Sequence, residues 1–181
     1  MNQGIQRLQW GCGSWTPVGW INSDIKEGPG IDLACDIRQG LPLDADSIDY
    51  AVSIHALPEI HFNDQLTVLK ELRRVLKPGG VLRLALPDLL KGVRAYERQD
   101  RDYFLVPDDQ AQSMGAKLIT QIIWYGYSRT LFVPEFIEEL LIKAGFSQVT
   151  HCQFQQTASS FPEIVTLDNR EKESLFVEAI K

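Results

Sequence analysis

Short apolar runs recur along this chain, and most have the length of β-strands. They are separated by glycine, proline and polar residues, which favour turns. The run over residues 48–54 is apolar except at Asp49 and Ser53, as expected of a parallel strand buried on both faces. The predicted strands are residues 5–10, 19–23, 31–35, 48–54, 81–86, 149–155 and 175–180.

Apolar stripes at helical spacing fill several of the longer intervals between these runs. One stripe begins after Asn63 or Asp64 and reaches Leu76, where a Pro-Gly-Gly sequence ends the helix. Another predicted helix has Pro134 in its first turn and is closed by Gly145. Two further helices are predicted, one over residues 89–99 and one that begins after a cap at Asp108 or Asp109.

The alternation of strands and helices in the middle of the chain predicts an α/β fold, with a Rossmann-like, mostly parallel seven-stranded sheet and helices on both faces. No helix separates the last two strands, so an antiparallel edge strand is expected. Residues 11–18 are too few for an ordinary crossover, and Pro17 argues against a full helix there. The first crossover helix is therefore predicted to be reduced or missing. A length of 181 residues fits one domain, residues 1–181.

A glycine turn, Gly11-Cys12-Gly13, directly follows the first strand, and Asp24 follows the second. Glycines let the backbone bend sharply and leave room for a ligand, since they have no Cβ atom. An acid at the end of the neighbouring strand is where a Rossmann-like sheet binds ribose hydroxyls. The order of strand, turn and acid therefore predicts a nucleoside site.

The absence of a third glycine helps to decide which kind of nucleoside the predicted site binds. The dinucleotide fingerprint needs a glycine where Thr16 stands, and a helix amino-terminus for the pyrophosphate. A nucleoside without a phosphate loses less binding free energy when that helix is missing, because it has no pyrophosphate for the helix amino-terminus to stabilise. A nicotinamide-dependent oxidoreductase is accordingly the weaker alternative.

Composition narrows the class of protein further. The formal net charge is −6, which argues against bulk nucleic-acid or anionic-membrane binding. No apolar run approaches the ~20 residues of a membrane span. The three cysteines have no paired spacing and no signal peptide is recognised, which favours the cytoplasm. Cys12, His55 and His61 match no zinc spacing, so no metal is expected.

The ordered set of these features resembles the class I S-adenosylmethionine-dependent methyltransferases, and most of all their small type-11 subgroup. The resemblance covers nearly the whole chain and depends on the order of its segments rather than on one motif. These segments are Gly11-Cys12-Gly13, Asp24, Asp36, residues 41–49, 76–80, 140–146 and 174–181.

The resemblance implies S-adenosyl-L-methionine as the cofactor. It assigns Gly11 and Gly13 to the methionine part, Asp24 to the ribose hydroxyls, and Asp36 with Ile37 to the adenine. His55, just past the fourth strand, would lie beside the methyl group and is the candidate catalytic residue. The cofactor-binding set that the resemblance implies is Trp10, Gly11, Cys12, Gly13, Asp24, Ile25, Asp36, Ile37 and His55.

The chain departs from the family pattern at the first turn. Gln9 stands where the family usually has an acid, and Ser14 and Trp15 follow Gly13 in place of a third glycine. Two functions are therefore carried forward. The first is an S-adenosylmethionine-dependent methyltransferase acting on a small-molecule or glycan-like acceptor. The alternative is a non-catalytic binding or interaction module that keeps the fold.

The candidates for acceptor chemistry lie at the ends of later strands. A general base is needed only if the acceptor is a hydroxyl or a similar acid, and His55, Glu59 and Asp88 are the candidates. A helix-capping role is favoured for Asp88. Tyr125 and Tyr127 are candidates to line an acceptor pocket. The sequence His-Ala-Leu-Pro at 55–58 is not the Asn-Pro-Pro-Tyr type, so a DNA base or glutamine is less favoured as acceptor.

Overall fold

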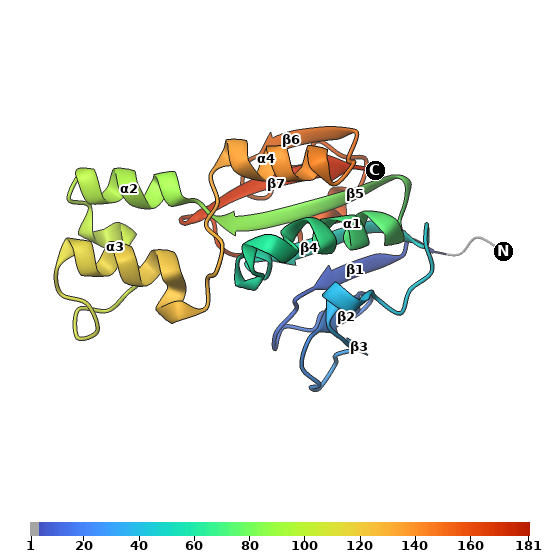
Figure 1. Ribbon diagram of the computed structural model, residues 1–181, viewed down its shortest axis with the longest axis horizontal. Helices are drawn as coiled ribbons and strands as arrows, with labels where there is room; N and C mark the ends of the chain where they lie inside the picture. Colours follow the sequence, from blue (N-terminus) through green and yellow to red (C-terminus); the bar gives the residue numbers. More distant parts are fainter. Residues whose placement is uncertain (1–3) are drawn as a thin grey trace.

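The computed structural model describes residues 4–181 and is built on one seven-stranded sheet (Figure 1). Its strand order is β3-β2-β1-β4-β5-β7-β6, and every strand pair is parallel except the two that β7 makes with β5 and β6. The strands are β1 (Arg7–Trp10), β2 (Ile21–Asp24), β3 (Leu33–Ala34), β4 (Ile48–Ile54), β5 (Leu76–Pro87), β6 (Gln148–Cys152) and β7 (Ser174–Ile180).

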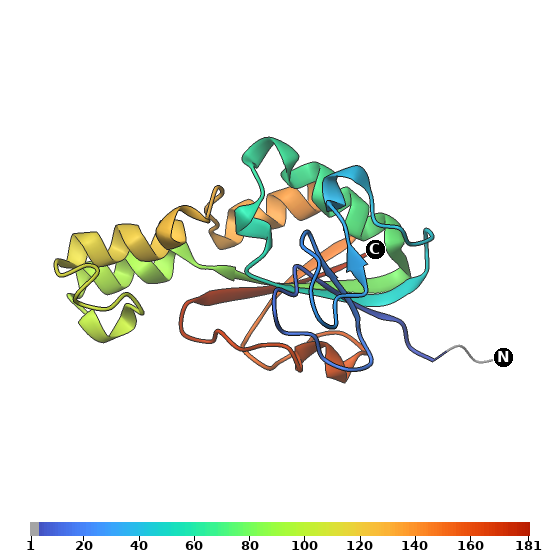
Figure 2. The same ribbon diagram turned by 90° about the horizontal axis from the view of Figure 1, so that it is seen from below.

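Two helices, α1 (Gln65–Val75) and α4 (Pro134–Lys143), pack side by side on one face of the sheet (Figure 2). Their buried leucine, isoleucine and valine side chains form the main core with the strands. Two others, α2 (Leu89–Glu97) and α3 (Met114–Ile123), form an arm that projects beyond the carboxyl end of β5 (Figures 1 and 2). The short 3-10 helices are η1 (Ile37–Gln39), η2 (Leu57–Glu59), η3 (Phe62–Asp64), η4 (Arg101–Tyr103), η5 (Trp124–Gly126) and η6 (Pro162–Val165).

The opposite face of the sheet is covered mainly by the segment 153–173, whose helical element is η6. Ile164 and Leu167 from this segment pack against Tyr50 and Val52 of β4. The segment is held by Arg83, a fully buried residue of β5 that pairs with Asp168 at 2.6 Å.

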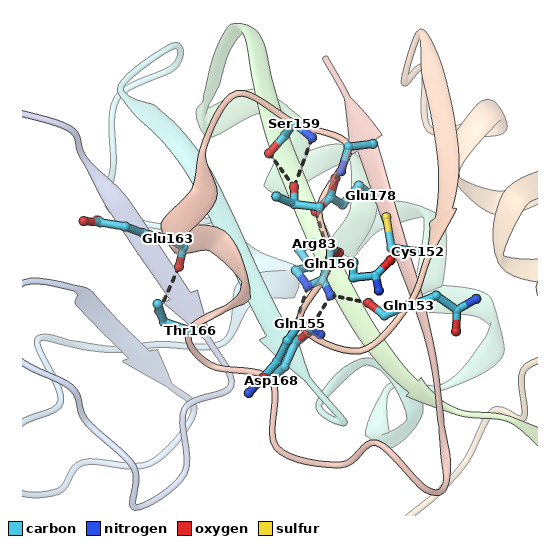
Figure 3. Close-up of polar contacts among 12 residues, drawn as sticks. Arg83, Cys152, Gln153, Gln155, Gln156, Ser159, Glu163, Thr166, Asp168 and Glu178 are labelled. Carbon is cyan, nitrogen blue, oxygen red and sulfur yellow. Dashed lines mark hydrogen bonds and ion pairs between the residues drawn. The ribbon is translucent and has the colours of Figure 1, made fainter.

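Arg83 is the centre of a buried polar cluster (Figure 3). Its guanidinium also pairs with Glu178 of β7 at 2.8 Å and donates to the carbonyl oxygens of Gln153 and Gln156. Breaking a buried ion pair leaves an uncompensated charge, which is strongly unfavourable. The cluster therefore fixes an otherwise irregular segment against the sheet.

The structure confirms the mostly parallel seven-stranded sheet and the missing first crossover helix. Residues 11–20, between β1 and β2, form turns without a helix. The strand at 48–54 has the predicted bounds, whereas β3 is only Leu33–Ala34 and β6 ends at Cys152. Within residues 4–181, no helix combines the length and apolar character needed to cross a membrane.

The predicted antiparallel edge strand is β6, which pairs antiparallel with β7, and one other predicted detail needs correction. The strand β7 itself lies inside the sheet, between β5 and β6. The reason is burial: β7 is buried along nearly its whole length, whereas β6 is polar and partly exposed, which suits an edge. The cap of α3 is Ser113, whose Oγ accepts from the Ala116 N–H at 3.1 Å, because Asp108 is paired with Arg101 and Lys117 instead.

Candidate functional site

A cleft of about 860 Å³ opens at the carboxyl ends of β1, β2 and β4. In parallel α/β sheets this edge is where ligands bind. Every residue that the sequence predicted to contact a cofactor lines this one cleft: Trp10, Gly11, Cys12, Gly13, Asp24, Ile25, Asp36, Ile37 and His55. Their individual binding roles remain predictions.

The glycine turn is tied to β2 by its main chain, without help from a helix. The N–H groups of Gly11 and Cys12 donate to the carbonyl oxygen of Ser23 at 2.8 and 3.0 Å. The N–H of Gly13 donates to Oδ2 of Asp24 at 2.9 Å, and Oδ1 accepts from the Lys26 N–H at 3.2 Å. Asp24 thus fixes the turn, while its carboxylate keeps lone pairs for a ligand.

The two glycines of the turn are required for different reasons. Both have positive φ, +68° at Gly11 and +57° at Gly13. A Cβ on Gly11 would lie 2.2 Å from the Cβ of Ala56, so the loop after β4 excludes a side chain there. A Cβ on Gly13 would meet no atom within 4 Å, so that position borders open space.

The carboxylate of Asp36, which precedes η1, already accepts hydrogen bonds from Arg38. Its Oδ1 accepts from the Arg38 N–H at 3.0 Å, and the Arg38 guanidinium binds both carboxylate oxygens. The hydrogen bonds from Arg38 lower the pKa of Asp36. The neighbouring Ile37 is buried in the main core, whereas Ile25 is 62% exposed and leaves an apolar surface open to the cleft.

His55 lies immediately after β4 in the left-handed conformation, with φ of +58°. Its Nε2 is 2.7 Å from the Oγ of Ser174. Burial, and then the positive charge of Arg170, lower the pKa of His55 to about 3. The imidazole is therefore neutral at physiological pH.

Gln9 has a buried polar atom with no partner. The residue is 3% exposed, and its Oε1 accepts no hydrogen bond from the rest of residues 4–181. Gln9 lines the cleft two residues before Gly11. An unsatisfied buried acceptor is unfavourable by about 1–3 kcal/mol, so this amide is available to a ligand's hydrogen-bond donor.

The other candidate residues for acceptor chemistry divide into those that line the cleft and those that do not. Asp88 caps α2, as predicted, because its Oδ1 accepts from the Leu90 N–H at 2.9 Å. Glu59 lines the cleft, and partial desolvation together with the nearby Asp24 raises its pKa. Tyr127 also lines the cleft, whereas Tyr125 donates to Gln110 instead.

Apart from Tyr127, the residues on the far wall of the cleft were missed by sequence reasoning. They come from the end of the arm and the segment before β7, which contribute Gln121, Trp124, Ser128, Arg129, Asn169, Arg170 and Glu173. Arg170 lies over the ring of Trp124 at 5.9 Å and so links the two segments. Nothing in their local sequence marks these residues, since the two segments meet at the cleft only in the folded chain.

Comparison with known proteins shows what this chain is similar to. Residues 9–84 match the model of the methyltransferase domain family. A methyltransferase from Thermotoga maritima, described as S-adenosylmethionine-dependent and a possible histamine N-methyltransferase, superposes with a TM-score of 0.61 at 22% identity, covering 97% of this chain and 82% of that one. An S-adenosylmethionine-dependent methyltransferase from Mesorhizobium loti gives 0.57 at 19% identity, covering 98% and 91%.

A third similar structure is a Haloferax volcanii methyltransferase in complex with the Trm112 methyltransferase activator, with a TM-score of 0.57, 16% identity, and coverage of 98% and 83%. No curated protein matches this sequence. Residues 9–84 thus match the methyltransferase domain model, and the similar structures show that the chain has the fold of the class I S-adenosylmethionine-dependent methyltransferases. S-adenosylmethionine is the cofactor that the matched family model and this fold imply.

Proposed function

We propose that this chain, as one domain, is an S-adenosylmethionine-dependent methyltransferase acting on a small-molecule or glycan-like acceptor. The observation that carries the proposal is the gathering of all the predicted cofactor-contact residues in one cleft at the carboxyl edge of the sheet. They come from three separate strand ends, β1, β2 and β4, and from the segment after β3. Chance packing would not be expected to bring the whole set to one cavity.

The residues present fit the proposed cofactor. The free Oε1 of Gln9 suits an ammonium group, the open space beside Gly13 suits close approach of the methionine part, and the carboxylate of Asp24 suits ribose hydroxyls. Asp36 and Ile37 are proposed to flank the adenine. Gln9 thus supplies a neutral acceptor where the family usually has an acid.

The cofactor supplies a methyl group activated by a sulfonium charge. The task of the chain is then to align the acceptor, which is worth up to ~7–11 kcal/mol in favourable intramolecular models. The neutral imidazole of His55 adds no positive charge beside the sulfonium. Glu59, a carboxylate of the cleft whose pKa is raised by desolvation and by Asp24, is the proposed proton acceptor where the methyl acceptor is a hydroxyl.

The far wall of the cleft supports the acceptor class. The aromatic rings of Trp124 and Tyr127 stand beside the polar side chains of Asn169, Arg129 and Arg170. A concave site with aromatic faces and a few polar groups is typical of small-molecule recognition. We also propose a cytoplasmic location, since Cys12, Cys35 and Cys152 are all free thiols.

Calorimetric titration with S-adenosylhomocysteine tests cofactor binding. The wild-type chain is expected to bind, and Asp24→Asn is expected to weaken binding about 10- to 100-fold, because hydrogen bonds to a charged group are worth about 1.5–3 kcal/mol. Asp109→Asn, outside the cleft lining, is the matched control and should bind like the wild type. Absence of heat and of any thermal shift at millimolar ligand would refute the proposal.

The non-catalytic module is the second candidate, favoured by Gln9 and by the missing helix after the glycine turn. Incubation with a cell extract and methyl-labelled S-adenosylmethionine separates the two candidates. Label transferred to an extract component by the wild-type chain, but not by Asp24→Asn, supports the enzyme. Binding of S-adenosylhomocysteine without any transfer supports the module.

A further inference from the structure

His55 is held in an uncommon conformation from several sides. A non-glycine residue with positive φ is uncommon, and such strain persists only where the surroundings enforce it. Here the His55 N–H donates to the Ala85 carbonyl of β5 at 2.9 Å. The next residue, Ala56, packs against Gly11. The backbone therefore presents this imidazole to the cleft at one fixed angle.

Ser174 is the partner that fixes the ring. It opens β7, lies 119 positions away in sequence, and is 1% exposed. Its main chain is anchored in turn, since its N–H donates to the Arg170 carbonyl and its carbonyl accepts from Lys91 Nζ at 2.7 Å. The 2.7 Å contact between Ser174 Oγ and His55 Nε2 thus joins two well-fixed residues.

The direction of this hydrogen bond follows from what each group can do. Within residues 4–181, the Oγ of Ser174 has no hydrogen-bond partner other than His55 Nε2. A buried hydroxyl hydrogen needs an acceptor, whereas an unfilled oxygen lone pair is more easily tolerated. Ser174 therefore donates and Nε2 accepts. A neutral imidazole carries one proton, so it resides on Nδ1, the ring nitrogen left for the cleft.

We propose that Ser174 is a positioning residue that fixes His55 as its Nδ1-protonated tautomer, so that His55 offers the cleft a hydrogen-bond donor and not a general base. The consequence of this tautomer for catalysis rests on the proposed function. A donor beside the reacting methyl suits an acceptor with an oxygen next to the methylated atom, as in neighbouring sugar hydroxyls. That chemistry narrows the glycan-like acceptor to one with adjacent oxygens.

Nitrogen-15 NMR of the imidazoles tests the tautomer directly, because protonated and bare ring nitrogens have well-separated shifts. The chain has only three histidines, so loss of one set of signals in His55→Asn assigns them. In the wild type, a protonated Nδ1 and a bare Nε2 are expected. Ser174→Ala should shift the ring toward the Nε2-protonated form, and Ser174→Thr, which keeps the hydroxyl, should restore the wild-type pattern.

The wild-type spectrum alone overturns the proposal if it shows the proton on Nε2. An unchanged tautomer in a folded Ser174→Ala also overturns it, because Ser174 would then not control the ring. Titration of the same samples with S-adenosylhomocysteine tests the proposed function separately. If the chain binds S-adenosylhomocysteine but His55 carries its proton on Nε2, only this inference is refuted. If His55 has the expected tautomer but the chain does not bind S-adenosylhomocysteine, only the proposed methyltransferase function is refuted.

Discussion

At the scale of single residues, the turn after β1 shows two glycines under different constraints. Gly11 faces the protein, since its missing side chain makes room for Ala56. Gly13 faces the cleft, and its N–H is held by Asp24. The first glycine therefore serves folding, and the second leaves space for a ligand.

Alanine substitution separates these constraints. Gly11→Ala is expected to lower the melting temperature strongly, because its Cβ would lie 2.2 Å from that of Ala56. Gly13→Ala should cost only about 1–2 kcal/mol, the price of a left-handed L-residue, yet weaken S-adenosylhomocysteine binding at least 10-fold. Thermal melting and calorimetry of both variants check this. Equal binding by Gly13→Ala and the wild type would contradict a ligand beside Gly13.

At the scale of elements, an irregular segment takes the place that a helix usually has on one face of the sheet. The segment 153–173 has only the short η6, and it contributes Phe161, Ile164, Val165 and Leu167 to the apolar cluster on this face. The Arg83 cluster adds to this anchoring by pairing with carboxylates from the segment and from β7. The same segment carries Asn169, Arg170 and Glu173 to the cleft, so its anchoring also shapes the site.

Removal of one carboxylate that pairs with Arg83 should show that the segment 153–173 depends on the cluster for its anchoring. Asp168→Ala is expected to lower the free energy of unfolding by about 3–5 kcal/mol, because it leaves the buried Arg83 short of a carboxylate. Urea denaturation measures the loss, and limited proteolysis should show new cleavage within residues 153–173. Glu139→Gln, which breaks an exposed pair with Lys143, is the control and should change stability by about 0.5 kcal/mol or less. A similar small effect of both variants would show that the cluster does not anchor the segment.

At the scale of the whole molecule, the cleft joins three regions: the strand ends, the arm and the segment before β7. His55 lies where they meet, since it follows β4, bonds to the first residue of β7 and experiences the charge of Arg170. Because the imidazole of His55 is buried in its unprotonated form, the stability of the whole fold depends on pH.

The sign of that coupling is definite. The pKa of His55 is about 3 in the folded chain against the ordinary 6.5, so between these values the unfolded chain binds a proton that the folded chain does not. Stability is therefore lost as pH falls below 6.5. The advantage of the wild type over His55→Asn should shrink by up to about 2 kcal/mol between pH 7 and pH 5.

Urea denaturation of both proteins at the two pH values gives this difference. Asparagine is the matched replacement because it tolerates the left-handed conformation. Other groups titrate alike in both proteins and cancel. A difference that stays constant with pH would show that His55 takes up its proton normally in the folded state.

The sequence by itself determined the mostly parallel sheet and the near wall of the cleft. Local signals sufficed there: apolar runs specify strands, the turn Gly11-Cys12-Gly13 directly follows β1, and Asp24 is the last residue of β2. Only the tertiary structure decided that β7 lies inside the sheet, that Trp124 and Arg170 complete the far wall, and that Ser174 bonds to His55. Those features are contacts between residues distant in sequence, and chain packing, not local pattern, selects such pairs.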